Sequence, residues 1–179
     1  MTNSTEPFAI LLDMASRSLN SARGLPAQVD IKPHWSGIGF SLGGHRFVAP
    51  MGEVAEILSP PAATRLPGVQ SWVRGVANVR GRLLPMIDLG SFFGRSLTGG
   101  RKNHRVLALE IGDLYSGLIV TEVYGMQHFP VDTFTDKITD DVSGLAPFLA
   151  GAYHHNDLVW TVFSPFKLVQ NPQFMNAAG

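Results

Sequence analysis

The sequence predicts an all-β domain preceded by one amphipathic helix. From Trp35 onward, short runs rich in Val, Ile, Leu and Phe alternate with Gly and Pro, as in strands joined by tight turns. Helical patterns beyond that point are few and short, so an alternating βαβ architecture does not fit. Many of the runs are too short to form a stable sheet alone. Closure into barrels would pair the backbone N–H and C=O groups at the sheet edges, so we expect barrels.

The one clear helix is expected over residues 5–24. Thr5 suits the N-cap, and Gly24 followed by Pro26 ends the helical pattern. Residues 1–34 are therefore expected to form a helix and a linker. Isolated helices of this length are marginal in water, so the apolar face should dock on the barrels or on a partner. That face comprises Phe8, Leu11, Leu12, Ala15 and Leu19.

The strands are expected within residues 35–170. The first hairpin is GIGFSL, a Gly43-Gly44 turn and HRFVAP. Further runs that fit strands are 53–58, 62–66, 73–79, 82–88, 104–110, 114–120, 122–129, 149–154 and 158–163. Short helical patterns occur at 89–93, 144–149 and 164–170. Residues 171–179 are expected to be a flexible tail.

Composition narrows the range of functions. The 179 residues carry 14 Lys and Arg against 14 Asp and Glu, so no overall charge attracts nucleic acid or an acidic membrane. The chain has no cysteine, which removes disulfides and thiolate chemistry and agrees with a reducing compartment. No secretory signal pattern opens the sequence, and no apolar run is long enough to span a membrane. We expect a cytoplasmic protein with no nucleic-acid partner and no direct membrane insertion.

Motifs for catalysis and metal binding are weak. Residues 39–43, GFSLG, match the G-x-S-x-G pattern of a hydrolase, but a second β-type run follows where that motif needs a helix. Ser41 is therefore expected to be an ordinary strand residue. The adjacent His154 and His155 would point to opposite faces of a strand, and are expected as an exposed loop pair. We expect no catalytic residue, no metal and no cofactor.

The most informative segment is 72–94, WVRGVANVRGRLLPMIDLGSFFG. It fits a strand, a tight turn rich in Asn, Arg and Gly, and a second strand. Gly75 and Gly81 leave the backbone uncovered or permit positive φ. An arginine cluster beside apolar surface has two interpretations. The arginines either lie in solvent at the rim of that surface, or they bind a partner protein through bidentate hydrogen bonds of their guanidinium groups. Periodicity alone favours the solvent-exposed rim. The cluster consists of Arg74, Arg80 and Arg82.

This segment resembles the CheW-like adaptor family. The family pattern Lys/Arg-Gly-Val-x-Asn-Leu-Arg-Gly-x-x-x-Pro-x-x-Asp-Leu is matched at residues 74–81, followed by Pro85, Asp88 and Leu89. Val79 stands where the family commonly has leucine. Similar residues upstream and downstream extend the resemblance over about residues 36–170, and they are VAEI at 54–57, LPG at 66–68 and GLIVTEV at 117–123.

The resemblance implies two five-stranded SH3-like barrels that share a core and have no active site. The implied partners are the cytoplasmic tip of a methyl-accepting chemoreceptor and the regulatory domain of a CheA-like histidine kinase. Glu56 and Arg80 match positions tied to receptor contact, and Val54 and Gly75 match positions tied to kinase contact. The protein would then be a non-enzymatic coupling adaptor, held at the inner face of the membrane through receptor arrays.

Two further implications concern the turn and the branch of the family. Asn78 and Gly81 look structural, since they would shape the turn that presents Arg80. The N-terminal helix, the WSGIGF entry into the first strand and GMQHFP at 125–130 look more like the PilI-type branch, which serves type IV pilus twitching, than the flagellar branch.

Several alternatives stay open beside this interpretation. One is a flagellar coupling protein of the same fold. A kinase regulatory domain has that fold too, but the chain lacks the ATP-binding boxes and the phosphotransfer helix of such kinases. The alternatives from other classes are a small β-barrel hydrolase that uses Ser41 and an OB-like nucleic-acid binder, which would want aromatic residues along a basic groove.

Overall fold

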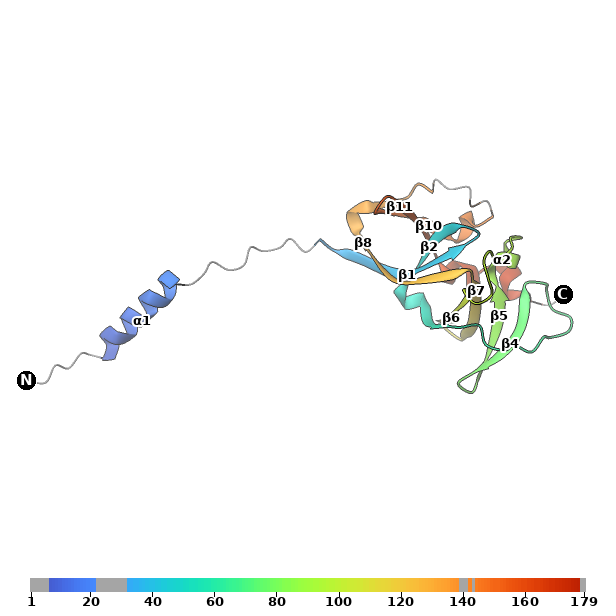
Figure 1. Cartoon of the computed structure of the whole chain (residues 1–179), viewed down its shortest axis with the longest axis horizontal. Helices are drawn as coiled ribbons and strands as arrows, with labels where there is room; N and C mark the ends of the chain where they lie inside the picture. Colours follow the sequence, from blue (N-terminus) through green and yellow to red (C-terminus); the bar gives the residue numbers. More distant parts are fainter. Residues whose placement is uncertain (1–6, 22–31, 139–141, 143, 178–179) are drawn as a thin grey trace, which may run out of the picture. The chain divides into compact units, whose positions relative to one another are not determined.

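The computed structural model describes residues 7–21, 32–138, 142 and 144–177. The chain divides into two compact units, Met1–Lys32 and Pro33–Gly179. Figure 1 shows the helix of the first unit and the strands of the second. No helix in the described part of the chain is long and apolar enough to cross a membrane.

The first unit contains helix α1 (Pro7–Ser21), within the expected range. An ion pair of 2.7 Å between Asp13 and Arg17 spans one turn of it. Leu11, Leu12 and Ala15, on the expected apolar face, have exposed side chains. The other expectations for this helix fall outside the described residues and side chains, and they concern Thr5, Phe8, Leu19, Gly24 and Pro26.

The second unit contains two sheets, one in the upper and one in the lower part of the domain in Figure 1. Among the described residues the first sheet has six strands in the order β8-β1-β2-β11-β10-β9, and the second has five in the order β3-β6-β7-β5-β4. The strands of the first sheet are β1 (His34–Leu42), β2 (His45–Pro50), β8 (Glu122–Pro130), β9 (Phe134–Thr135), β10 (Leu149–His155) and β11 (Leu158–Phe163). Those of the second are β3 (Val54–Leu58), β4 (Val73–Val79), β5 (Arg82–Asp88), β6 (Arg105–Ile111) and β7 (Leu114–Val120).

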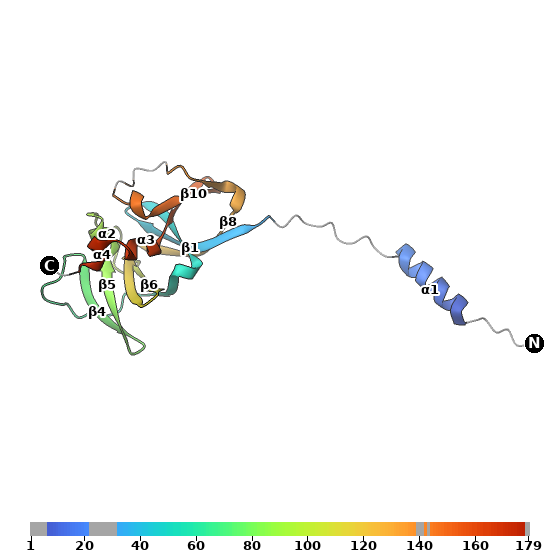
Figure 2. The same ribbon diagram turned by 180° about the vertical axis from the view of Figure 1, so that it is seen from behind.

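Short helical elements connect and cover these strands. The α-helices, of which α3 and α4 are red in Figure 2, are α2 (Leu89–Phe92), α3 (Pro165–Val169) and α4 (Pro172–Met175). The 3₁₀ turns are η1 (Met51–Glu53), η2 (Val131–Thr133) and η3 (Ala146–Phe148). The two sheets are built alike, because each combines antiparallel hairpins with one parallel pair, β2 with β11 and β5 with β7.

Strand β6 shows how the two sheets share a core. Leu107 and Leu109 point to one face and join a cluster that also contains Phe40 and Phe163 of the other sheet. Val106 and Ala108 point to the opposite face and join a cluster made only from the five-stranded sheet. Side chains alternate between the faces of a strand, so the continuous apolar run at residues 106–109 is buried on both sides of β6.

The six-stranded sheet has a small core of its own. Phe129 stacks on Tyr153 with ring centroids 4.9 Å apart, and Trp160 lies beside them in the same cluster. Burial raises the pKa of the Tyr153 phenol, because desolvation disfavours its charged form. One shared cluster and one interior cluster per sheet are the packing expected of two small barrels with a common core.

The strand predictions hold with one exception. Residues 62–66 do not form a strand, and in this segment only Thr64 pairs, through an isolated bridge to Val76. Pro60, Pro61 and Pro67 flank the segment, and proline cannot donate to a ladder. The two-residue strand β9 was not predicted, so the first sheet has six strands where five were expected.

The expectation of a flexible tail from residue 171 is wrong for residues 171–177. Asn171 caps α4, since its Oδ1 accepts hydrogen bonds from the backbone N–H groups of Gln173 (2.9 Å) and Phe174 (3.2 Å). Phe174 is buried in the shared core and stacks on Trp72, with ring centroids 6.1 Å apart. The last turn of the chain is therefore part of the folded domain.

We predict that Phe174→Ala destabilises the domain by about 3 kcal/mol, because it removes a buried aromatic ring from the shared core. Met175→Ala is the matched control, since the neighbouring Met175 is exposed and should change stability by less than about 0.5 kcal/mol. Urea unfolding followed by tryptophan fluorescence measures both changes. Equal stability of the two variants would show that the end of the chain does not anchor the core.

Candidate functional site

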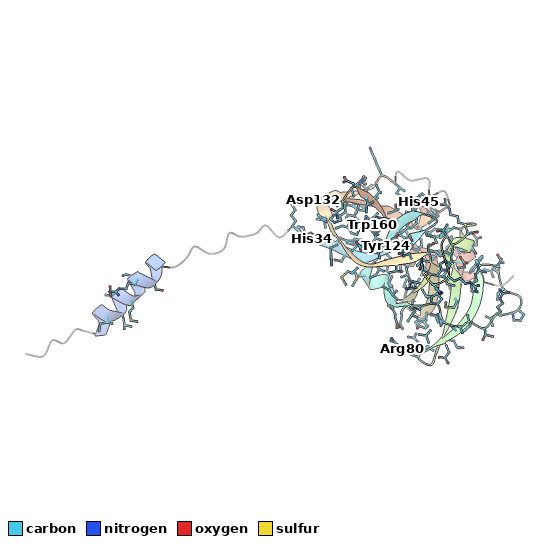
Figure 3. All side chains as sticks on the ribbon, in the orientation of Figure 1. His34, His45, Arg80, Tyr124, Asp132 and Trp160 are labelled. Atoms are coloured by element: carbon cyan, nitrogen blue, oxygen red, sulfur yellow. The ribbon has the colours of Figure 1, made fainter. Side chains whose placement is uncertain are left out.

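The turn between β4 and β5 is built by two residues in the left-handed region. Arg80 has φ +52° and Gly81 has φ +80°, as a type I′ hairpin requires. The side-chain Oδ1 of Asn78 accepts a hydrogen bond of 2.9 Å from the backbone N–H of Gly81. Figure 3 shows Arg80 at the far end of this hairpin, where its side chain is 80% exposed.

The two residues matched to receptor contact lie together. Arg80 Nη2 donates to Glu56 Oε1 at 2.5 Å. Glu56 lies on β3, which is one edge of the five-stranded sheet, and Arg80 directly follows β4, which is the other edge. The ion pair therefore spans the two edges of the sheet. Pairs as exposed as this one contribute little to stability, so its main effect is to hold two opposite charges in one place at the surface.

The other two arginines of the cluster also have carboxylate partners. Arg82 Nη1 donates to Glu110 Oε1 at 2.9 Å, and the Arg82 guanidinium lies 4.0 Å from the centre of the Tyr115 ring. Arg74 pairs with Asp88. Each arginine of the cluster thus bonds to a carboxylate that lies on another strand: Arg74 of β4 to β5, Arg82 of β5 to β6, and Arg80 of the turn to β3.

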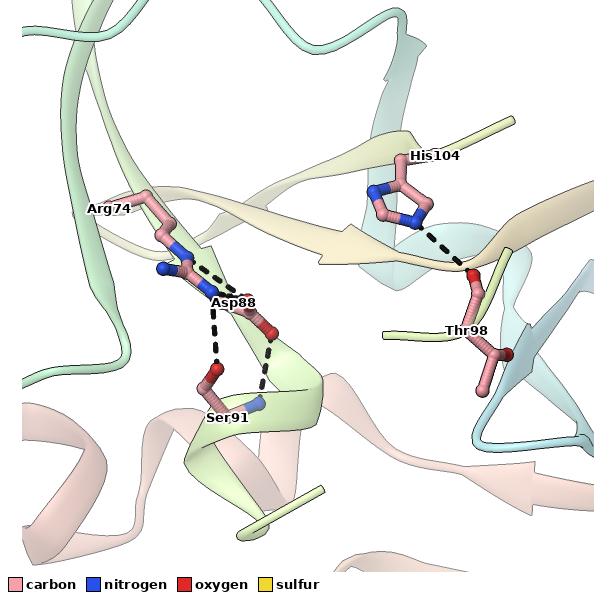
Figure 4. A network of polar contacts seen from close by, with 5 residues as sticks. All are labelled: Arg74, Asp88, Ser91, Thr98 and His104. Atoms are coloured by element: carbon pink, nitrogen blue, oxygen red, sulfur yellow. Dashed lines mark hydrogen bonds and ion pairs between the residues drawn. The ribbon is translucent and has the colours of Figure 1, made fainter. Parts of the chain in front are cut away.

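Asp88 is a buried carboxylate in the polar network of Figure 4. Its side chain is 3% exposed, and Oδ2 accepts from both Nε (3.0 Å) and Nη2 of Arg74. Oδ1 accepts from the backbone N–H of Ser91 at 2.9 Å and so caps α2. A buried charge is tolerated only when it is paired and hydrogen-bonded, so this network fixes the exit from β5.

The two residues matched to kinase contact lie on the same edge strands. Val54 begins β3 and is half-buried against the shared core. Gly75 on β4 is buried at φ +131°, and a Cβ built on it would lie 2.2 Å from the carbonyl oxygen of Thr64. Thr64 and Val76 exchange two backbone hydrogen bonds of 2.9 Å. The absence of a side chain at Gly75 therefore lets the chain's own β3–β4 connection pack closely on β4.

The motifs that the sequence disfavoured do not form a catalytic arrangement. Ser41 is buried within β1, where it pairs with Arg46 of β2 and Glu122 of β8. The chain turns after β1 directly into β2, without the helix that a nucleophile elbow needs. His154 and His155 end strand β10, so their placement in a loop was wrong. In the described part of the chain, no group of three or more His, Cys, Asp or Glu side chains could hold a metal ion.

Sequence reasoning missed the partners of the arginine cluster. Glu56 was singled out, but the sequence alone did not show that it bonds to Arg80. Glu110 and Tyr115, which hold Arg82, were not singled out at all. The one signal in the sequence was that Glu110 directly follows the apolar run of residues 106–109, and the structure places it at an exposed position of β6.

These features define an all-β domain of two sheets with a charged hairpin at one edge. The family model of the CheW-like domain matches residues 36–173. The chain therefore belongs to the CheW-like family, as its sequence resemblance predicted.

Individual relatives cover most of the chain. It is 51% identical over 178 residues to Protein PilI of Pseudomonas aeruginosa, which is 99% of each chain. It is 28% identical over 134 residues to the chemotaxis protein CheW of Helicobacter pylori, which is 73% of this chain and 81% of that protein. The crystal structure of the scaffolding protein TtCheW from Thermoanaerobacter tengcongensis has the same fold, with a TM-score of 0.65 and 24% identity over 76% of this chain and 93% of that one.

We predict that Gly75→Ala lowers the free energy of unfolding by at least about 3 kcal/mol, because the new methyl group would displace the Thr64 backbone as well as strain φ. Gly44→Ala is the matched control: Gly44 has φ +86° but open space around it. That variant should lose only about 1 kcal/mol, from backbone strain alone. Chemical denaturation of the isolated protein measures both, and equal losses would contradict the tight contact at Gly75.

Proposed function

We propose that this protein is a non-enzymatic adaptor that couples a methyl-accepting chemoreceptor to a CheA-like histidine kinase in an array that controls type IV pilus twitching. The observation that carries the proposal is the 51% identity to Protein PilI over 99% of both chains. A flagellar role for the same fold is the second candidate, and the lower identity to the chemotaxis protein CheW of Helicobacter pylori makes it the weaker one. The proposed location is the cytoplasm, at the inner face of the membrane.

The proposed receptor surface is centred on the ion pair of Glu56 and Arg80. Large apolar side chains near both residues are open to solvent: Ile57, next to Glu56 in sequence, is 39% exposed, and Leu83, three residues after Arg80, is 69% exposed. Arginine beside exposed apolar side chains is a common composition at the centre of protein interfaces. A receptor side chain that bonds to Arg80 would meet a guanidinium that the hydrogen bond to Glu56 already orients.

The proposed kinase surface includes Val54 and the β3–β4 connection. Gly75 lies under Thr64 of that connection, so its contribution to kinase binding would be to let the connection pack closely on β4. Leu66 in the same connection is 44% exposed and would be available to a partner. In this proposal Gly75 shapes the surface that the kinase meets, and Val54 supports it from β3.

We predict that Arg80→Glu weakens capture of the receptor's cytoplasmic fragment by at least about tenfold, because it reverses the charge at the hairpin tip and repels Glu56. The melting temperature should shift by less than about 3 °C, since so exposed an ion pair adds little stability. Binding of each protein variant to the surface-immobilised receptor fragment gives the affinity. In cells, the variant should fail to restore twitching to a strain that lacks the protein.

Lys137→Glu is the control for this experiment, because it makes the same charge change at an exposed residue that follows β9. It should bind the receptor fragment within twofold of the unchanged protein. Kinase capture by Arg80→Glu should also be normal. Normal receptor binding by Arg80→Glu, or an equal loss of binding in both variants, would show that Arg80 is not part of the receptor surface.

A further inference from the structure

A cavity of about 810 Å³ opens beside the Arg74–Asp88 pair. One wall comes from the β3–β4 connection, and the other comes from the loop between α2 and β6. Figure 4 shows part of this region, with Arg74, Asp88 and Ser91 on one side and His104 bonded to the Thr98 carbonyl on the other. The basic side chains that line the cavity are Arg65, Arg74, Arg101, Lys102, His104 and Arg105.

The charge of this cavity is unbalanced. Asp88 is the one carboxylate among the lining residues, and it is already bonded to Arg74. Within the described ranges, the side chains of Arg65, Arg101 and Lys102 have no carboxylate partner. The remaining cation, Arg105, donates from Nη1 to two backbone carbonyls at 2.8 Å, and these neutral acceptors leave its charge in place.

This concentration of charge is unusual for the chain as a whole, whose basic and acidic residues balance at 14 each. It also differs from the arginine cluster of the β4–β5 hairpin, in which every guanidinium has a carboxylate. Like charges gathered around a hollow raise the local potential and attract counter-ions. An anion that entered the cavity would relieve the repulsion between the two loops.

The volume of the cavity and its other lining residues indicate a small ligand. The volume lies within the range of about 300–1,000 Å³ that is typical of small-molecule sites. Pro60, Leu97 and Ile119 supply apolar walls, and the hydroxyl groups of Ser59 and Ser96 add hydrogen-bonding capacity. Arginine side chains bind phosphate oxygens in a bidentate manner. An extended acidic peptide would instead suit cations that follow a ridge or an edge strand.

We propose that this cavity binds a small organic phosphate or polyphosphate that carries at least two negative charges. The ligand would bridge Arg65 of the β3–β4 connection and the Arg101–Arg105 segment of the opposite loop. The proposal goes beyond the adaptor function and does not rest on it. It also uses none of the residues assigned to the receptor surface.

Calorimetric titration of the full chain tests this proposal. The ligands are sodium phosphate, pyrophosphate and tripolyphosphate, and the buffer contains about 150 mM NaCl to screen non-specific attraction. We expect saturable binding at one site that tightens along the series, together with a raised melting temperature. The double variant Arg65→Ala/Arg101→Ala should weaken pyrophosphate binding by at least about tenfold, because it removes two charge-assisted contacts. Both residues are exposed, so the variant should fold, and Lys102→Gln offers a second, milder variant.

Lys137→Ala is the control, since it removes one positive charge, as each substitution of the double variant does, from an exposed residue that does not line the cavity. It should alter pyrophosphate binding by less than twofold. The proposal fails if no phosphate compound binds saturably, or if Lys137→Ala weakens binding as much as the double variant. It also fails if a hexaglutamate peptide binds in an Arg65- and Arg101-dependent manner while the phosphates do not, because the cavity would then serve an acidic protein segment.

Discussion

The two sheets of this domain are held together by one shared cluster of apolar side chains. Phe40 and Phe163 meet edge to face at 5.9 Å within the six-stranded sheet, and the same cluster takes Leu107, Leu109 and Leu118 from the five-stranded sheet. Neither sheet could bury this face alone, and a small domain has few other sources of stability. The helices at the end of the chain complete the cluster through Leu168 and Phe174, so the fold uses the chain almost to its last residue.

The shared core leaves the outer edges of the five-stranded sheet available for function. Strands β3 and β4 are its two edges, and edge strands are the natural places for partners to bind. The ion pair of Glu56 and Arg80 joins the edges at one end, and the bridge from Thr64 to Val76 covers β4 nearer its middle. The proposed receptor and kinase surfaces are thus two parts of one sheet rim. A shared scaffold of this kind allows two partners to be held at once without any moving part.

Most of the fold follows from the sequence because strand alternation and Gly-rich turns are local signals. The Arg80-Gly81 turn and the apolar runs of β6 and β7 were predictable in this way. Residues 62–66 were misjudged because only Thr64 in this segment favours a strand, and the flanking prolines prevent a ladder. Residues 171–177 were misjudged because the burial of Phe174 depends on its contact with Trp72. A local sequence pattern does not predict a contact between segments so far apart in the chain. The ion pairs and the basic cavity were missed for the same reason: both form between segments that only the folded sheet brings together.

We propose that one domain holds a receptor and a kinase at the same time, and a three-component binding experiment would test this proposal. The full chain would be mixed with a soluble receptor cytoplasmic fragment and the kinase regulatory domain, and the species would be sized by analytical ultracentrifugation. We expect a ternary complex in which each partner leaves the affinity for the other unchanged or higher. Mutual displacement of the two partners, with only binary complexes at any concentration, would contradict it.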